Sequence, residues 1–177
     1  NELEELKKRD PEPGEARLGL GLIFLEQERV DEAITELSLL LEERPEMLKV
    51  AYYLGLALAK KGEVDRALDA FAKVGPDLPE YVDSRLRMAV LLVEEHNDPA
   101  AAIRILEEAL EHANAANDAA DTPAAAEPGG PPAESPSDAA HDTPDPKVRL
   151  YRVLAYAQEK AAQPLHAIQS LEAARAL

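Results

Sequence analysis

The 177-residue sequence contains no cysteine and no tryptophan, and only 4% of its residues are aromatic. Without cysteine the chain can form no disulfide, no cysteine-ligated zinc site and no thiol nucleophile. No apolar run approaches the roughly 20 residues that cross a bilayer, and no signal-peptide or lipid-attachment pattern is visible. Because alanine and leucine dominate the apolar fraction of 46%, the composition favours helices packed at close range over a β-sheet.

Basic residues are also scarce, since 19 Lys and Arg stand against 35 Asp and Glu and give a net charge of −16. A nucleic-acid backbone is bound by clustered cations, so this charge balance argues against a nucleic-acid partner. The four histidines are scattered without the spacing of metal ligands, and no glycine-rich phosphate loop or nucleophile motif occurs. We therefore expect no metal, no cofactor and no enzymatic activity.

What the sequence does contain is an internal repeat with a period of 34 residues. Leu20 returns as Leu54 and Met88, each followed by a small residue. The second half of each unit repeats an alanine and, four residues later, a large apolar residue. The third unit has one additional residue at its internal turn, and the fourth unit follows the third after a long intervening segment. These positions are Ala33 and Leu37, Ala67 and Phe71, Ala102 and Leu106, and Ala167 and Leu171. A fixed period in this range is typical of a solenoid built from helix pairs.

Each unit is predicted to form two helices. The first helix of the second unit has apolar and small residues spaced i, i+3, i+4 and i+7, namely Ala51, Leu54, Gly55 and Leu58. Gly62 is expected to end that helix in the left-handed conformation. Pro99 and Pro164 are expected near the starts of later second helices, where the missing N–H of proline is harmless. The small residues at Gly55 and Ala67 predict a close crossing of the two helices.

These columns resemble the tetratricopeptide repeat (TPR) family, whose motif combines a Leu-Gly or Leu-Ala pair, an alanine, a large apolar residue and often a closing proline. The closing proline is present as Pro45 and Pro79. The family's aromatic at the start of the first helix is replaced in three units and kept in one, the four residues being Arg17, Ala51, Arg85 and Tyr151. The resemblance covers residues 14–110 and 147–177, and it implies an all-α fold: a right-handed α-α superhelix, or solenoid, of stacked antiparallel helix pairs.

The repeat spacing divides the chain into six segments. They are the tail of a preceding repeat's second helix (1–13), three TPR units (14–47, 48–81 and 82–111), an insert (112–146) and a fourth TPR unit (147–177). The insert has no Val, Ile, Leu, Met, Phe, Tyr, Lys or Arg and holds seven of the fourteen prolines, so it cannot bury enough apolar surface to offset its ordering entropy. Helix is expected to continue for a turn or two into the insert before Pro123 stops it. The insert is then an inert surface loop or a tether.

A second stripe on the first helices is also apolar, where an ordinary surface helix would carry charge. By the resemblance, this stripe lines the concave face of the superhelix and forms a peptide-binding groove. The candidate binding residues are Leu18, Leu22, Leu25, Tyr52, Tyr53, Leu56, Leu86, Arg87, Val90, Val93, Arg152 and Tyr156. The two tyrosines are expected to be surplus to the core, because the packing stripe of their helix is complete without them, and tyrosine suits recognition surfaces.

The leading interpretation is a non-catalytic scaffold that holds an apolar or amphipathic segment of a protein or peptide in the concave groove. In some TPR proteins, a cluster of Lys, Arg and Asn on this face holds the C-terminal carboxylate of a peptide. Such a clamp is not expected here, because only one of the five matching positions is a cation. These positions are Leu18, Leu22, Tyr53, Asp83 and Arg87. Two alternatives stay open. The array could be a structural spacer that self-associates through uncapped ends, or the regulatory part of a larger enzyme.

Cellular context is less well specified by the residues. Both ends lack a polar cap, which suggests an excerpt of a longer array, and the alanine- and proline-rich insert suggests a bacterial source. We expect no direct membrane insertion. A soluble location in the cytoplasm or in the periplasm fits the sequence equally well.

Overall fold

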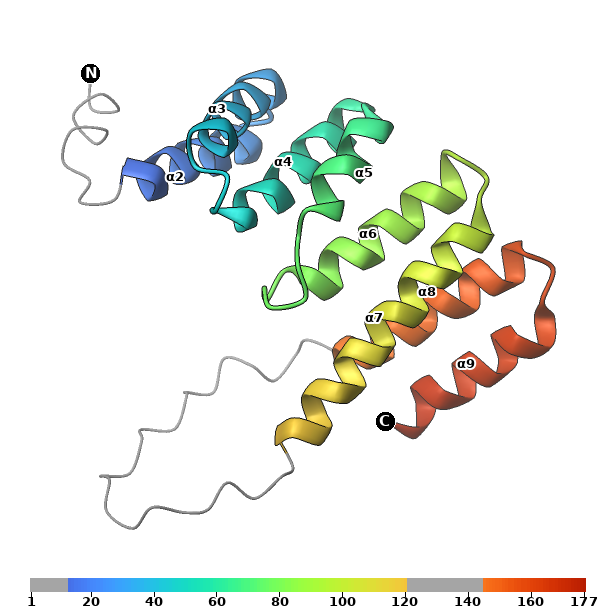
Figure 1. Cartoon of the computed structure of the whole chain (residues 1–177). Coiled ribbons are helices and arrows are strands. Elements are labelled where there is room, and N and C mark those ends of the chain that lie inside the picture. The colour runs from blue at the N-terminus through green and yellow to red at the C-terminus, as the bar shows by residue number, and fades with distance from the viewer. Residues whose placement is uncertain (1–12, 121–144) are drawn as a thin grey trace, which may run out of the picture. The chain divides into compact units, whose positions relative to one another are not determined.

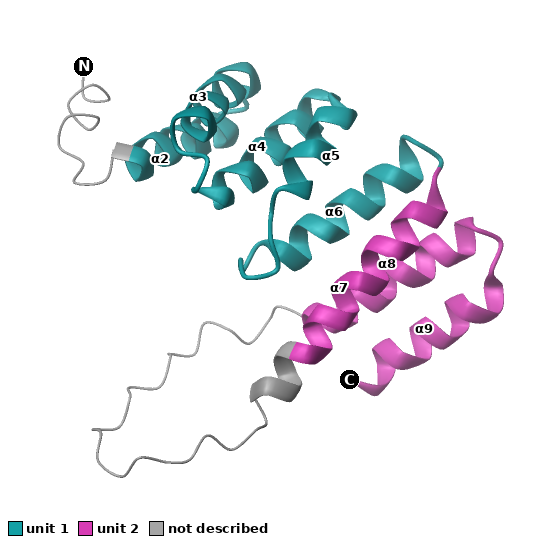
Figure 2. Ribbon diagram, in the orientation of Figure 1, with its two compact units in different colours: residues 1–97 teal, residues 98–177 magenta. Residues whose placement is uncertain are grey.

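The structure, a computed structural model, describes residues 13–120 and 145–177, and every regular element in these residues is an α-helix (Figure 1). The chain divides into two compact units, Asn1–Asn97 and Asp98–Leu177 (Figure 2). The division falls inside the predicted third repeat, between its two helices. The predicted helix tail at residues 1–13 and most of the predicted insert lie outside the described residues, so these two predictions stay open.

The first unit contains five helices in its described part: α2 (Pro13–Glu26), α3 (Val30–Glu43), α4 (Leu48–Lys61), α5 (Val64–Ala72) and α6 (Tyr81–Glu94). Each helix packs against the next, and α2 also contacts α4. The centre of this unit is made of fully buried large side chains, among them Leu37, Leu40, Val50, Leu58 and Phe71. The apolar columns of the sequence therefore form the core, as the repeat pattern predicts.

Two glycines allow the helices of a pair to approach closely. A Cβ atom on Gly21 of α2 would come within 2.7 Å of the Leu37 side chain in α3, and one on Gly55 of α4 within 2.6 Å of the Phe71 ring in α5. Both separations are far below van der Waals contact, so only glycine fits at these two crossings. The same contact thus recurs one period along the chain, which confirms the predicted close crossing.

The second unit contains α7 (Pro99–Ala120), α8 (Pro146–Lys160) and α9 (Pro164–Ala176), with α8 packed against both α7 and α9. Pro99 and Pro164 are the first residues of their helices, as predicted. Asp145 caps α8 by accepting a hydrogen bond from the Lys147 N–H at 2.7 Å. The helix of α7 continues through Ala120, as expected for the residues before Pro123.

The turn after each first helix contains one residue in the left-handed region. Gly62 has φ = 83° and ends α4, as predicted. The equivalent residues in the other three turns are not glycines, yet they adopt the same conformation: Glu28 (φ 60°), Asn97 (φ 51°) and Ala162 (φ 58°). The turn geometry is therefore fixed by the helix pair, and the glycine in one of four copies relieves a strain that the other three carry.

The arginines that replace the family's aromatic tie neighbouring helices together. Arg85 of α6 donates to the carbonyl oxygens of Phe71 and Val74 at 3.2 Å and 2.9 Å, and these carbonyls lie at the end of α5. Arg17 of α2 pairs with Glu43 of α3 at 2.5 Å. A cationic side chain at this column thus satisfies helix-end carbonyls and acidic residues that an aromatic could not.

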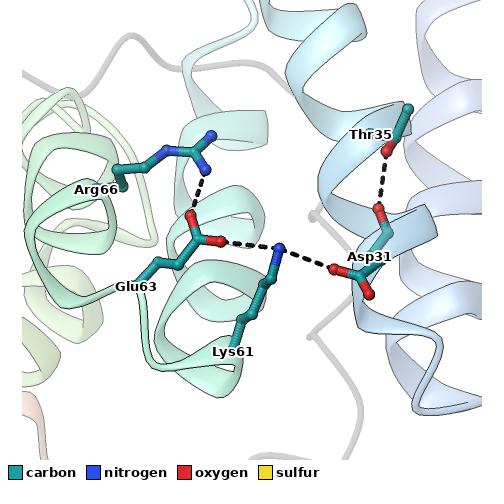
Figure 3. Close-up of polar contacts among 5 residues, drawn as sticks. All are labelled: Asp31, Thr35, Lys61, Glu63 and Arg66. Carbon is teal, nitrogen blue, oxygen red and sulfur yellow. Dashed lines mark hydrogen bonds and ion pairs between the residues drawn. The ribbon is translucent and has the colours of Figure 1, made fainter.

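An exposed ion-pair chain links the first two repeats (Figure 3). Lys61 Nζ lies 2.9 Å from Asp31 Oδ1 of α3 and 2.8 Å from Glu63 Oε1 in the turn before α5. Glu63 also accepts a hydrogen bond from Arg66. The hydrogen bonds with Glu63 and then Asp31 raise the pKa of Lys61, and the bond with Lys61 lowers the pKa of Glu63. All of these groups are solvated, so salt screens them.

Candidate functional site

The twelve predicted binding residues fall into three groups in the structure. Four are buried: Leu18, Tyr52, Leu86 and Val93. Six in the first unit are exposed or half-buried, namely Leu22, Leu25, Tyr53, Leu56, Arg87 and Val90; we call these six the open first-helix face. The last two, Arg152 and Tyr156, lie on α8 in the second unit. The structure therefore leaves accessible six of the ten predicted residues in the first unit, together with the two predicted residues in the second unit.

The open first-helix face contains a repeated aliphatic column. Leu22 of α2, Leu56 of α4 and Val90 of α6 are separated by 34 residues each, so they occupy the same position in three successive first helices. Leu22 and Leu56 are half-buried, whereas Val90 has 42% of its surface exposed. Part of the apolar surface of this column is therefore accessible, most of all at Val90.

The expectation that both tyrosines are surplus to the core is wrong for Tyr52, whose side chain is buried. Its ring packs with its centroid 6.0 Å from that of Phe71 and 5.2 Å from that of Tyr53. The side chain is buried because the next first helix, α6, supplies polar partners for its hydroxyl. Tyr53 is half-buried and remains part of the open first-helix face.

Tyr52 belongs to a polar cluster that joins α4 to α6. Its hydroxyl donates a hydrogen bond to Asp83 Oδ2, and Arg87 Nε donates to the Tyr52 hydroxyl at 3.3 Å and to Asp83 Oδ2 at 3.2 Å. Burial, reinforced by the bond to Asp83, raises the pKa of Tyr52. Burial alone would lower the pKa of Arg87, but its contacts with Tyr52 and Asp83 outweigh this effect and raise it.

Other charges beside the open first-helix face are also paired across repeats. Lys49 of α4 lies 2.5 Å from Glu15 of α2, the residue one full period earlier, and this hydrogen bond raises the pKa of Lys49. Lys60 lies 3.2 Å from Glu28 in the preceding turn. These cations are neutralised by partners within the chain, so the face offers apolar surface with paired charges at its edges.

Comparison with known proteins identifies the family. Residues 1–47 and 37–78 match the sequence profile of the tetratricopeptide repeat family. These residues belong to the tetratricopeptide repeat family. TPR repeats typically serve as protein-interaction scaffolds and are generally not enzymes. The matched residues include α2 and α4, which carry four of the six residues of the open first-helix face.

Solved structures of TPR-like proteins have the same fold. A crystal structure of MamA matches with a TM-score of 0.68 and 17% identity, over 97% of this chain and 82% of MamA. A second MamA structure, from MSR-1, gives 0.63 and 21% over 98% and 81%. The nearly identical TPR-like repeats of a candidate kinesin light chain from Podosopora anserina give 0.63 and 17% over 94% and 75%. These likenesses confirm the predicted all-α helix-pair fold. No curated protein matches the chain.

The helix pair α8–α9 of the second unit presents a different set of groups. Arg152 of α8 is exposed, and Tyr156 is half-buried with the Lys160 ammonium 5.4 Å from its ring centroid. Ser170 of α9 donates a buried hydrogen bond of 2.8 Å to Gln158 of α8. Arg152 and Tyr156 are described within their own unit alone, so their membership in a common site with the first unit stays a prediction.

A small pocket that the sequence did not predict lies between α2 and α3. Its volume is about 250 Å³, and it is lined by Phe24, Asp31, Glu32, Thr35 and Glu36. The chain already engages the polar lining, because Arg29 stacks 4.4 Å over the Phe24 ring and pairs with Glu32 at 2.9 Å, while Asp31 pairs with Lys61. The pocket adds no group to the open first-helix face.

The described residues, 13–120 and 145–177, contain no group of three or more His, Asp or Glu side chains that could hold a metal ion. Within the same residues, no helix is both long and apolar enough to cross a membrane. Sequence reasoning missed one polar element of the site, the bond of Tyr52 to Asp83. The signal was present, because Asp83 and Arg87 stand 31 and 35 residues after Tyr52, close to one repeat period.

Proposed function

We propose that the open first-helix face binds an apolar or amphipathic segment of a protein partner, so that the chain acts as a non-catalytic interaction scaffold. The observation that carries the proposal is the aliphatic column of Leu22, Leu56 and Val90. Its position recurs in three successive first helices, and Val90 leaves 42% of its surface to solvent. A contiguous apolar surface on a soluble fold usually marks an interaction site.

The charges around the column support an apolar guest over an acidic one. Lys49 and Lys60 are each held by a glutamate of the preceding repeat, and Arg87 is held through Nε by Asp83 and Tyr52. An acidic ligand would have to break these pairs, whereas an aliphatic side chain can enter between them without desolvating an unpaired charge. Tyr53 adds an amphipathic ring beside Leu56 that suits such a contact.

The experiment is a selection of binding peptides from a random library displayed on phage, with the full chain as target. We expect the selected peptides to carry two or more large apolar residues, because the column offers a row of aliphatic contacts. Val90→Glu and Leu56→Glu should each weaken binding of a selected peptide at least about tenfold, since a buried unpaired carboxylate costs several kcal/mol. Binding is read by fluorescence anisotropy of the labelled peptide.

The matched control is Leu39→Glu on α3. Leu39 is as exposed as Val90, with 44% of its surface in solvent, but it lies in a column where the equivalent residues Lys73 and Glu108 are charged. The control variant should bind the peptide like the unchanged chain. Circular dichroism must show the same helix content for all three variants. The proposal would be refuted if the selected peptides bound Val90→Glu and Leu56→Glu with the same affinity as the unchanged chain.

A further inference from the structure

One glycine of α2 has no role in helix packing. Four glycines lie inside the described helices, and at three of them an added Cβ atom would come within 2.7 Å of a neighbouring side chain; these three are Gly14, Gly21 and Gly55. At Gly19, no described atom from outside α2 lies within 4 Å of the Cβ position, and φ is not positive. Glycine inside a helix is destabilising relative to alanine, so Gly19 lowers stability without a reason in packing or backbone conformation.

Gly19 stands in a column that is accessible along the first unit. The equivalent residues one and two periods later are Tyr53 and Arg87, and both belong to the open first-helix face. Tyr53 is half-buried although α2, α3 and α5 all pack against α4, so the column stays accessible in the interior of the unit and not only at its first described helix. The later first helices thus carry a large side chain where α2 carries none.

The ring of Tyr53 lies beside the space that Gly19 leaves. The ion pair of Glu15 with Lys49, at 2.5 Å, joins α2 to α4, and Gly19 and Tyr53 each follow one member of this pair by about one turn. Leu22, half-buried, follows Gly19 by one further turn on the same side of α2. We call the space bordered by Gly19, Leu22 and Tyr53 the Gly19 subsite.

Contacts within the unit hold the Tyr53 ring in one orientation. Its centroid lies 5.2 Å from that of Tyr52 with an angle of 73° between the rings, which is an edge-to-face pair. Tyr52 is itself buried, packs beside Phe71 and donates a hydrogen bond to Asp83. An aromatic wall that is ordered before a ligand arrives loses little entropy on binding.

The chemistry of the subsite favours an uncharged ring. Because Glu15 and Lys49 are bonded to each other, a charged ligand group would compete with this pair, whereas an apolar group can bind without separating it. An aromatic ring gains attraction from a second ring beyond the area that it buries. A flat ring can also approach the backbone of α2 closely, since Gly19 places no side chain in its way.

We propose that the Gly19 subsite receives one aromatic side chain of the bound segment, and that Gly19 is the residue that determines this specificity. The inference rests on the proposed function, because it concerns the segment that lies on the open first-helix face. Leu22 borders both the subsite and the aliphatic column of Leu22, Leu56 and Val90. The aromatic residue of the partner is therefore next to the apolar residues that contact this column.

The test begins with two parallel phage selections from one random peptide library, with the unchanged full chain and its Gly19→Leu variant as targets. Leucine fills the subsite and has a higher helix propensity than glycine, so the melting temperature of the variant should rise by about 2–4 °C. A weaker binding by this variant then does not come from unfolding. We expect aromatic residues to be enriched in the peptides selected with the unchanged chain and not in those selected with Gly19→Leu.

A double-mutant cycle then tests the contact itself. A peptide selected with the unchanged chain should bind Gly19→Leu at least about tenfold more weakly, as measured by fluorescence anisotropy. The same peptide with its aromatic residue replaced by alanine should bind both chains with affinities that agree within about twofold. The matched control is Thr35→Leu, which adds a leucine at an exposed position of α3 and should bind the original peptide like the unchanged chain.

Two results would overturn the inference and leave the proposed function standing. One is an equal frequency of aromatic residues in the two selections. The other is an equal loss of affinity for Gly19→Leu by the original and the alanine-substituted peptide. The proposed function is judged separately, since it fails if Val90→Glu and Leu56→Glu bind the peptide normally, whatever the result for Gly19→Leu. A library that yields no binding peptide for the unchanged chain contradicts both.

Discussion

The hydroxyl of Tyr52 on α4 donates a hydrogen bond to the carboxylate of Asp83 on α6, and Arg87 donates to both. The two helices are the first helices of successive repeats, and Phe71 of the intervening α5 lies against the Tyr52 ring. The bond therefore couples two neighbouring repeats. It also removes Tyr52 from the surface that a partner can reach.

The first prediction concerns the strength of this coupling. Tyr52→Phe deletes the hydroxyl and leaves a half-buried carboxylate with one donor fewer, so we expect the free energy of unfolding to fall by about 1–2 kcal/mol. Urea denaturation followed by circular dichroism measures the loss. Tyr53→Phe is the matched control, because its hydroxyl makes no hydrogen bond to a described residue, and its effect should stay within about 0.5 kcal/mol. Equal losses in both variants would contradict the coupling.

The second prediction concerns alkaline pH. The pKa of Tyr52 in the folded chain is raised above its ordinary value of 10.0 by burial and by Asp83. The unfolded chain therefore loses this proton first, and the stabilisation is complete below pH 10 and is lost as the pH rises through the folded pKa. Unfolding free energies measured from neutral pH to above pH 10 should show a decline that Tyr52→Phe lacks. A decline of equal size in that variant would assign the effect to other groups.

The third prediction concerns the close crossing of α4 and α5. Gly55→Ala places a Cβ atom within 2.6 Å of the Phe71 ring, so we expect a loss of about 1–3 kcal/mol in unfolding free energy from overpacking. Gly19→Ala is the opposite case, because nothing lies within 4 Å of its Cβ position in the middle of α2. That variant should gain about 0.5–1 kcal/mol from helix propensity. The unfolding free energies of both variants are measured by thermal or urea denaturation. A lower unfolding free energy in both variants would contradict the explanation by packing.

The fourth prediction concerns the turns after the first helices. Gly62 and Ala162 occupy equivalent left-handed positions, with φ of 83° and 58°. Gly62→Ala should lower the free energy of unfolding by about 1 kcal/mol, because a Cβ atom is strained in this region. Ala162→Gly should raise it by about 0.5 kcal/mol, since the relief of strain exceeds the added entropy of the unfolded chain. Effects of the same sign in both variants would show that the turn residue does not set the strain.

Much of the fold follows from the repeat period alone. The close helix crossing at Gly55, the left-handed conformation of Gly62 and the helix starts at Pro99 and Pro164 were all predicted and are confirmed. Each of these features depends on local chemistry: a small residue at a crossing, a free φ at a helix end, a missing donor in a first turn. These local patterns depend on residue type at fixed positions, and a repeat sequence shows each position in several copies.

The predicted site was harder to read because burial depends on neighbours outside the helix. Periodicity identified a second apolar stripe, but it could not show that α6 supplies Asp83 to Tyr52 and so draws that ring into the core. Nor could residue type reveal the left-handed conformations of Glu28 and Ala162, since neither residue favours that region. The geometry of the helix pair imposes these conformations, although the backbone preferences of Glu and Ala disfavour them.

The central claim is that partners bind at the open first-helix face, and chemical-shift mapping of a selected peptide on the isotope-labelled chain tests it most directly. The account predicts that the methyl groups of Leu22, Leu25, Leu56 and Val90 shift together on titration, and that the same shifts are lost in Val90→Glu and kept in Leu39→Glu. Shifts confined to residues of α9 or to Leu39 of α3, with these four methyl-bearing residues unmoved, would contradict it.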